Sequence, residues 1–202
     1  MDLKIEPCEG VYAPEEDSIL LAGAAARHAK GRVLDLGCGT GLAGITAAFK
    51  PEVNAVVFAD ISPLAIACSR NNVQRNGVTA KASFTEGDLF DKVEGKFDTI
   101  MFNPPYLPTN EDEHVAGLLD VAFDGGPDGR AVSDRFIKTV TGHLEKNGIV
   151  LLVSSSLASS EEEGKGNEET KRELESQGFA VEEVGRESFF FEKLVVLLAR
   201  RR

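Results

Sequence analysis

The chain has 202 residues, of which 42% are hydrophobic, and 33 acidic against 22 basic side chains give it a net charge of -11. This length is typical of one globular domain, so we expect a single domain over residues 1–202. The acidic balance argues against a protein held to nucleic acid mainly through phosphate contacts. No apolar run approaches the roughly 18 to 20 residues of a membrane span, and Met1–Gly10 lacks the pattern of a signal peptide. We therefore expect a soluble, cytoplasmic protein without a membrane partner.

The cysteines and histidines suggest neither disulfides nor a metal site. Cys8, Cys38 and Cys68 are odd in number and show no Cys-x-x-Cys spacing, which fits a reducing compartment. We predict that all three are reduced and buried as small apolar side chains. The three histidines share no spacing and no identifiable acidic partner, so we expect no metal ligands among them.

Helices and strands alternate along most of the chain. Pro14, followed by three acidic residues, favours a helix start, Ser62-Pro63 offers a second one, and Gly77 a helix end. Short apolar runs predict strands between the helices. In chain order the predicted elements are a helix at 14–28, a strand at 32–36, a helix from 45, a strand at 55–59, a helix at 62–76, strands at 81–85 and 97–102, a helix at 132–146, a strand at 149–154, a helix ending at Gly178, and strands at 179–184 and 194–199.

Two segments stand apart from this alternation. Residues 1–30 are expected to form an N-terminal helical segment. The stretch 154–169 is rich in Ser, Glu and Gly, which predicts a mobile, solvated loop. The segment 109–130 is too irregular to assign.

Alternating strands and helices predict an α/β fold. We expect a mostly parallel, Rossmann-like sheet of seven strands with helices on both faces and an antiparallel hairpin at its C-terminal edge. Ligands of such folds bind at the carboxyl ends of the strands. Asp35, Gly37, Asp60, Asp88 and Asn103 all follow predicted strand ends, and this convergence predicts a site there.

The glycine loop after the first strand points to a cationic cofactor. Gly39-x-Gly41-x-x-Gly44 matches the dinucleotide fingerprint, with Asp60 about 20 residues on, where it could hold a ribose. Asp35, however, stands two residues before Gly37, where a carboxylate would repel a pyrophosphate and attract a cation. S-adenosylmethionine carries an ammonium and a sulfonium and no phosphate, so it fits better. The structural alternative is that Asp35 caps the following turn.

Two further residues complete the predicted cofactor site. Asp88 follows the third strand and could accept a hydrogen bond from the adenine amine, while Leu89 could pack on the ring. Asp88 taken alone fits a turn residue equally well.

Asn103-Pro104-Pro105-Tyr106, here called the tetrad, suits methylation of a planar nitrogen. Such a nitrogen has a delocalised lone pair and needs help to attack a methyl group. The side-chain carbonyl of Asn103 can accept one N–H, and the backbone carbonyl of Pro104 the other. These hydrogen bonds strengthen as positive charge develops on the nitrogen. Tyr106 offers a stacking face; the alternative is a plain turn with a packing tyrosine.

With these motifs in this order, the chain resembles the class I S-adenosylmethionine-dependent methyltransferases. Val11–Ser18 and Gly125–Arg130 further resemble the HemK-related release-factor glutamine methyltransferases, in their short archaeal and eukaryotic branch. This resemblance implies methyl transfer to the side-chain amide of the glutamine in the Gly-Gly-Gln motif of a class 1 translation release factor. It also implies that Ser18 lies at the cofactor, with Tyr12 and Pro14 nearby. Eukaryotic relatives work with a small zinc-binding activator subunit, which makes such a partner conceivable here.

Other functions remain open from the sequence. The same tetrad chemistry would serve an exocyclic amine such as N6 of adenine in RNA or DNA, and a protein lysine is a further acceptor. A nicotinamide-dependent oxidoreductase and a catalytically silent cofactor-binding scaffold are the alternatives from other classes. The glycine-rich segment from Asp124 to Arg130 fits either a flexible substrate lip or a surface turn.

Overall fold

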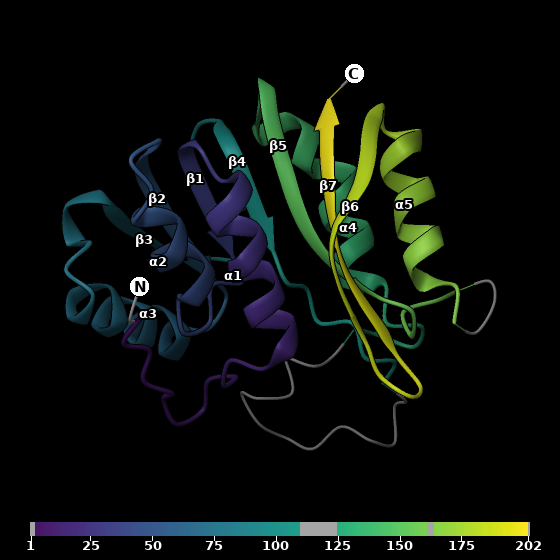
Figure 1. The fold of residues 1–202 in the computed structure, drawn as a ribbon, viewed down its shortest axis with the longest axis horizontal. Helices are drawn as coiled ribbons and strands as arrows, with labels where there is room; N and C mark the ends of the chain where they lie inside the picture. The colour runs from purple at the N-terminus through teal and green to yellow at the C-terminus, as the bar shows by residue number, and fades with distance from the viewer. Residues whose placement is uncertain (1–2, 110–124, 161–163, 202) are drawn as a thin grey trace.

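The computed structural model describes residues 3–109, 125–160 and 164–201, which form one seven-stranded sheet with helices on both faces (Figure 1). The strand order is β3-β2-β1-β4-β5-β7-β6. Strands β1 to β5 pair in parallel, and β7 is antiparallel to both of its neighbours. The predicted Rossmann-like fold with an antiparallel C-terminal hairpin is confirmed. None of the helices among these residues is long and apolar enough to cross a membrane.

Helices and strands alternate along the first two thirds of the chain, except that β4 follows β3 with no helix in the described residues between them. The strands are β1 (Gly31–Leu36), β2 (Val53–Asp60), β3 (Ala82–Glu86), β4 (Phe97–Phe102), β5 (Leu144–Ser155), β6 (Phe179–Ser188) and β7 (Lys193–Arg201). The α-helices are α1 (Glu16–His28), α2 (Leu42–Ala48), α3 (Pro63–Arg75), α4 (Ala131–Thr139) and α5 (Gly166–Ser176), with short 3-10 turns at Thr79–Lys81 and Val140–His143.

The sheet is buried on both sides, which explains its near-continuous apolar strands. Side chains of α1, α2 and α3 pack on one face, where Val33 of β1 belongs to the same core cluster as Leu21 of α1. On the other face Phe136 of α4, Leu174 of α5 and Leu34 of β1 belong to a second core cluster. Successive residues of β1 therefore enter opposite layers, as the two-residue period of a strand requires.

Some boundaries differ from the predicted ones because strand pairing overrides local propensity. The predicted helix at 132–146 ends at Thr139, and β5 begins at Leu144, which pairs with Phe97 of β4 and is fully buried. The hairpin strands β6 and β7 are longer than predicted, since β6 continues to pair with β7 beyond the apolar part, as far as the pair of Ser188 with Lys193. By contrast, α3 begins where expected, with the Ser62 side chain accepting a hydrogen bond from the Ala65 amide.

Both segments that the sequence set apart differ from the prediction. Within 1–30 the helix covers only Glu16–His28, and the preceding residues lie along α3 instead. The Asn72 side chain holds them there: its amide donates to the Glu6 carbonyl, and its oxygen accepts from the Glu6 backbone N–H. Within 154–169, β5 runs to Ser155 and α5 begins at Gly166, so the connection is shorter than the predicted loop.

The cysteine prediction is wrong for two of the three residues. Cys8 and Cys68 form a disulfide that joins the N-terminal segment to α3 across 60 residues of sequence. Cys38 is free and buried as predicted, and burial raises the pKa of its thiol, which keeps it protonated. Counting cysteines could not reveal the pair, because Cys8 reaches Cys68 only once the N-terminal segment has packed on α3.

We expect the Cys8→Ser variant to be less stable than the wild type by about 2–4 kcal/mol, because a cross-link over a long loop restricts the unfolded chain. Thermal unfolding with and without reductant measures the effect. Reductant should lower the Tm of the wild type and leave that of the variant unchanged. Thiol titration of the denatured, unreduced wild type should find one free thiol; three would contradict the disulfide.

Candidate functional site

A cavity of about 600 Å³ opens at the carboxyl ends of β1, β2, β3 and β4. This volume lies within the range of small-molecule and cofactor sites. Its lining comes from segments 10–17, 36–39, 60–65, 87–89 and 102–107, together with Val132, Arg135 and Glu192. Five acidic side chains face one basic side chain in this lining, and Arg135 is already paired with Asp88 at 2.7 Å. The cavity therefore favours a cationic ligand over an anionic one.

The glycine loop forms one wall of the cavity. Gly37 and Gly39 line it, both with positive φ, so the backbone approaches without a side chain in the way. The Gly39 amide donates to a carboxylate oxygen of Asp60 at 3.0 Å, and the other oxygen of Asp60 accepts from the Ser62 amide. Asp60 thus joins the loop after β1 to the end of β2, while still lining the cavity.

Asp35 lies behind the loop rather than in the cavity lining. It is 3% exposed, and its carboxyl accepts a hydrogen bond from the Gly44 amide at the start of α2. Burial raises the pKa of Asp35 to about 8. The structure therefore places Asp35 in the supporting role that the sequence left as an alternative. Gly41, which precedes α2, and Ser18 are likewise outside the lining.

At the point where Asp35 contacts α2 there is no room for a side chain on Gly44. We expect Gly44→Ala to destabilise the protein by about 1–3 kcal/mol through overpacking. An added methyl group would lie 2.4 Å from the Phe58 ring and 2.7 Å from the Asp35 carboxyl. The matched control is Gly142→Ala, where no atom lies within 4 Å of the added group. Urea unfolding of both variants compares them; equal stability would contradict the crowding.

Asp88 and Leu89 reach the cavity as predicted. Asp88 is held by its ion pair with Arg135 of α4. Leu89 has a φ of +46°, a conformation uncommon for a residue with a side chain. Such strain persists where the surroundings fix it, and it clusters at functional sites.

The tetrad follows β4 directly, and all four of its residues line the cavity. The Asn103 amide nitrogen donates to Asp17 at 2.9 Å. Because a carboxylate only accepts hydrogen bonds, the Asn103 atom that faces Asp17 must be the amide nitrogen, and the side-chain oxygen faces the other way. The Asn103 side-chain oxygen is buried and accepts no hydrogen bond from the described part of the chain. A buried acceptor without a donor is costly, so it indicates a ligand that supplies one.

Asp17 is the site residue whose role sequence analysis missed. Its carboxylate is 3% exposed and accepts from Asn103, from the Tyr106 hydroxyl at 3.1 Å and from the Tyr12 hydroxyl at 3.3 Å. Burial and the nearby carboxylates raise the pKa of both tyrosines, which keeps their hydroxyls protonated as donors. Acidic residues are common in the first turn of a helix, so the sequence did not indicate that Asp17 would contact Asn103 and the two tyrosines.

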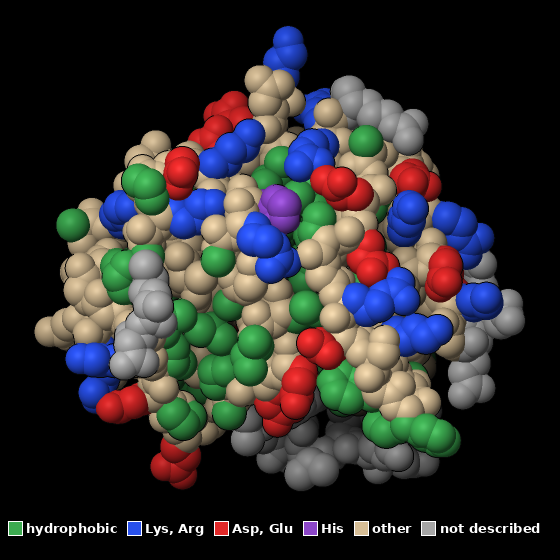
Figure 2. Space-filling model, in the orientation of Figure 1, with side chains coloured by type: hydrophobic (Ala, Val, Ile, Leu, Met, Phe, Trp, Pro, Cys, Tyr) green, Lys and Arg blue, Asp and Glu red, His purple; other side chains and the backbone are tan. Residues whose placement is uncertain are grey.

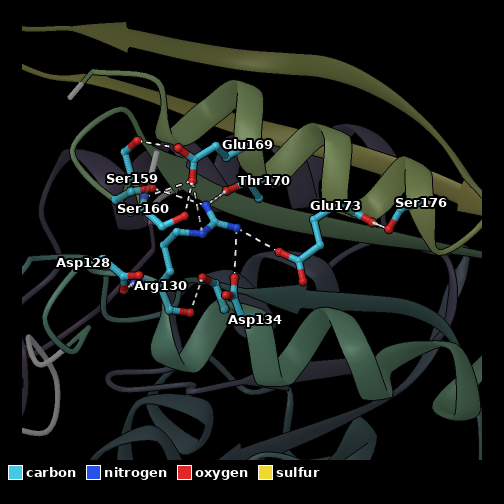
Figure 3. Close-up of polar contacts among 11 residues, drawn as sticks. Asp128, Arg130, Asp134, Ser159, Ser160, Glu169, Thr170, Glu173 and Ser176 are labelled. Atoms are coloured by element: carbon cyan, nitrogen blue, oxygen red, sulfur yellow. Dashed lines mark hydrogen bonds and ion pairs between the residues drawn. The ribbon is translucent and has the colours of Figure 1, made fainter. Parts of the chain in front are cut away.

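The described part of the glycine-rich segment, residues 125–130, contains a turn at 127–128 whose Pro127 is exposed, and it ends in a buried arginine. Arg130 is 3% exposed and binds Asp134, Glu169 and Glu173, as well as the carbonyl of Ala158 (Figure 3). Asp124 lies outside the described residues.

This buried cluster ties the start of α4 to α5 and supports the tetrad. The Gly125 amide donates to the Leu107 carbonyl. A side chain at Gly129 would lie 2.3 Å from the Tyr106 carbonyl, so the segment packs directly behind the tetrad. The predicted solvation of Glu169 is wrong, because this residue pairs with Arg130 in the cluster.

The chain is similar to several known proteins. The family described as the methyltransferase small domain matches residues 4–122. A Methanocaldococcus jannaschii protein, provisionally named a protein N5-glutamine methyltransferase, is 44% identical over 98% of this chain and 95% of its own. The release factor glutamine methyltransferase of Deinococcus radiodurans is 38% identical over 62% of this chain and 46% of its own. Among solved structures, the E. cuniculi Mtq2-Trm112 complex, described as responsible for methylating the termination factor eRF1, has a TM-score of 0.67 at 23% identity and covers 96% of this chain and 99% of its own.

Proposed function

Because the chain belongs to the methyltransferase small domain family, we propose that it methylates the side-chain amide nitrogen of the glutamine in the Gly-Gly-Gln motif of a class 1 translation release factor. It is an S-adenosylmethionine-dependent N-methyltransferase. The observation that carries the choice of a planar nitrogen is the buried side-chain oxygen of Asn103, which accepts no hydrogen bond from the described residues. The relatives named after glutamine and release factors support an amide as that nitrogen.

The residues present fit S-adenosylmethionine. The acidic lining suits its ammonium and sulfonium, and the volume suits a molecule of its size. Gly37 and Gly39 would face it with bare backbone, Asp60 would take the ribose hydroxyls, and Asp88 with Leu89 would hold the adenine. When bound, S-adenosylmethionine supplies an electrophilic methyl group carried on sulfur.

The tetrad would hold the acceptor amide. One N–H of the glutamine would donate to the Asn103 side-chain oxygen and the other to the Pro104 carbonyl, which fixes the nitrogen in place for attack. Both acceptors become stronger partners as the nitrogen gains positive charge, so they stabilise the transition state more than the ground state. Asp17 keeps Asn103 oriented for this task. No base is needed beforehand, because the nitrogen loses its proton only after methylation has made it strongly acidic.

Ser18, Asp35 and Gly41 belong to the proposal only indirectly. Ser18 donates to Asp17 through its hydroxyl at 3.1 Å, so it would support Asp17. Asp35 would act through Gly44 by shaping the start of α2. Gly41, whose φ is +83°, would let the loop turn into that helix. A cationic group bound near Asp35 would favour its ionised form, since opposite charges lower the pKa of a buried acid.

A small partner subunit forms part of the proposal. The Mtq2 structure that shares this fold is a complex with Trm112, and the HemK resemblance implies an activator that binds zinc. A cytoplasmic location follows from a substrate that acts in translation termination.

The test incubates the purified protein with S-adenosylmethionine and a class 1 release factor from the same source, with and without the Trm112-like subunit, and locates added methyl groups by mass spectrometry. We expect one methyl on the Gly-Gly-Gln glutamine and none when that glutamine is alanine. Transfer only in the presence of the subunit would establish that requirement. No transfer in either mixture, or methylation of another residue type, would overturn the proposed substrate.

A further inference from the structure

The β6–β7 hairpin ends in three consecutive exposed phenylalanines, here called the aromatic tip. Phe189 is 40% exposed, Phe191 is 74% exposed, and Phe190 is fully exposed. In the space-filling view the hydrophobic side chains of this tip protrude at the lower right, where the hairpin extends past the sheet (Figure 2). Folding gains nothing from side chains left in water, so stability does not account for them.

The local chemistry of the turn does not call for phenylalanine either. The Phe189 amide donates to the Glu192 carbonyl at 2.7 Å, which leaves Phe190 and Phe191 as the two-residue connection of the hairpin. Such connections favour glycine, asparagine and aspartate. Exposed apolar residues on a β-hairpin also invite aggregation. Sequences break local rules of this kind most often at functional positions.

The aromatic tip lies beside the mouth of the cavity. Strand β6 is parallel to β1 through β5, so its carboxyl end points to the same end of the sheet as the site. Glu192, next to Phe191, lines the cavity and accepts a hydrogen bond from Ser155 at 2.6 Å. Leu107, one residue after the tetrad, is 36% exposed and also lines the cavity. Exposed apolar side chains therefore occur both in the cavity lining, at Leu107, and at the tip, at the same end of the sheet.

We propose that the aromatic tip is the docking surface for the protein substrate, and that it inserts into an apolar depression beside the acceptor loop of that substrate. This inference rests on the proposed function and extends it. Aromatic side chains placed at the centre of a contact contribute more binding energy than most other types. A protein is favoured over RNA as the occupant because Glu187 and Glu192 flank the tip and would repel phosphates.

The test compares the double variant Phe190→Ser/Phe191→Ser with the wild type. We expect the Kd and KM for the release factor to rise about 10- to 100-fold, the range for loss of interface hot spots. The Kd for S-adenosylmethionine, the Tm and the kcat at saturating factor should not change. Phe190→Leu/Phe191→Leu keeps the tip apolar and should retain most of the affinity. Ile19→Ser removes an apolar side chain that is 62% exposed on α1 and should behave as wild type.

The outcomes separate the two proposals. If the wild type methylates the factor and Phe190→Ser/Phe191→Ser leaves the Kd and KM for the factor unchanged, the docking surface alone is overturned. A wild type that neither binds nor methylates the factor would overturn the proposed function and the docking surface with it. If Phe190→Ser/Phe191→Ser loses affinity for single-stranded RNA and keeps its affinity for the factor, the choice of a protein as the occupant is overturned.

Discussion

Asn103→Ala is expected to lower kcat for methyl transfer by about 10²- to 10³-fold, the loss seen when one group that stabilises a transition state is removed. The variant loses the buried oxygen that would accept an N–H of the acceptor. S-adenosylmethionine binding should remain close to normal, because most of the proposed cofactor contacts come from the loops after β1, β2 and β3. Single-turnover kinetics measures transfer, and calorimetry measures cofactor binding.

Asn71→Ala is the matched control, since it removes an exposed asparagine from α3, away from the cavity lining. It should transfer methyl groups at the wild-type rate. An unchanged kcat in Asn103→Ala would remove the basis of the mechanism. A loss of transfer that follows an equal loss of cofactor affinity would make Asn103 a cofactor ligand rather than the holder of the acceptor.

Asp17→Ala is expected to lower kcat about 10- to 100-fold, because a positioning residue acts through the group it orients and a small displacement of that group slows the reaction. Without the carboxylate, the Asn103 amide is free to turn, and the hydroxyls of Tyr12 and Tyr106 lose their shared acceptor. The KM for the protein substrate should change little. Buried donors left without an acceptor should also lower the free energy of unfolding by about 1–3 kcal/mol.

Asp17→Asn distinguishes the role of Asp17 in orienting Asn103 from its contribution to packing. Its side-chain oxygen can still accept from Asn103, so it should recover part of the lost kcat. Glu16→Ala is the control, because Glu16 is the exposed neighbour of Asp17 in the same helical turn and lies outside the cavity lining. If Asp17→Ala lowered the Tm and left kcat at the wild-type value, Asp17 would be a structural residue only.

The predictable part of the site consists of residues that directly follow strands. β4 spans 97–102 as predicted, so the tetrad lies where the sequence implied. Gly37, Gly39, Asp60, Asp88 and Leu89 reach the cavity for the same reason. The burial of Asp35 behind the loop could not be predicted, because alternation along β1 shows which layer a side chain enters but not whether a loop covers it.

The sequence by itself determined the order of helices and strands, the parallel sheet and the motifs at its carboxyl edge, because apolar periodicity, caps and turns act over a few residues. The tertiary structure decided the rest. Asp17 meets Asn103 across 86 positions, Cys8 meets Cys68 across 60, and Arg130 binds Glu173 across 43. A carboxylate, a thiol and a guanidinium each have many potential partners along the chain, and only the packing of helices on the sheet selects one of them. Local chemistry therefore predicted where the site lies, whereas packing determined which side chains hold its reactive groups in place.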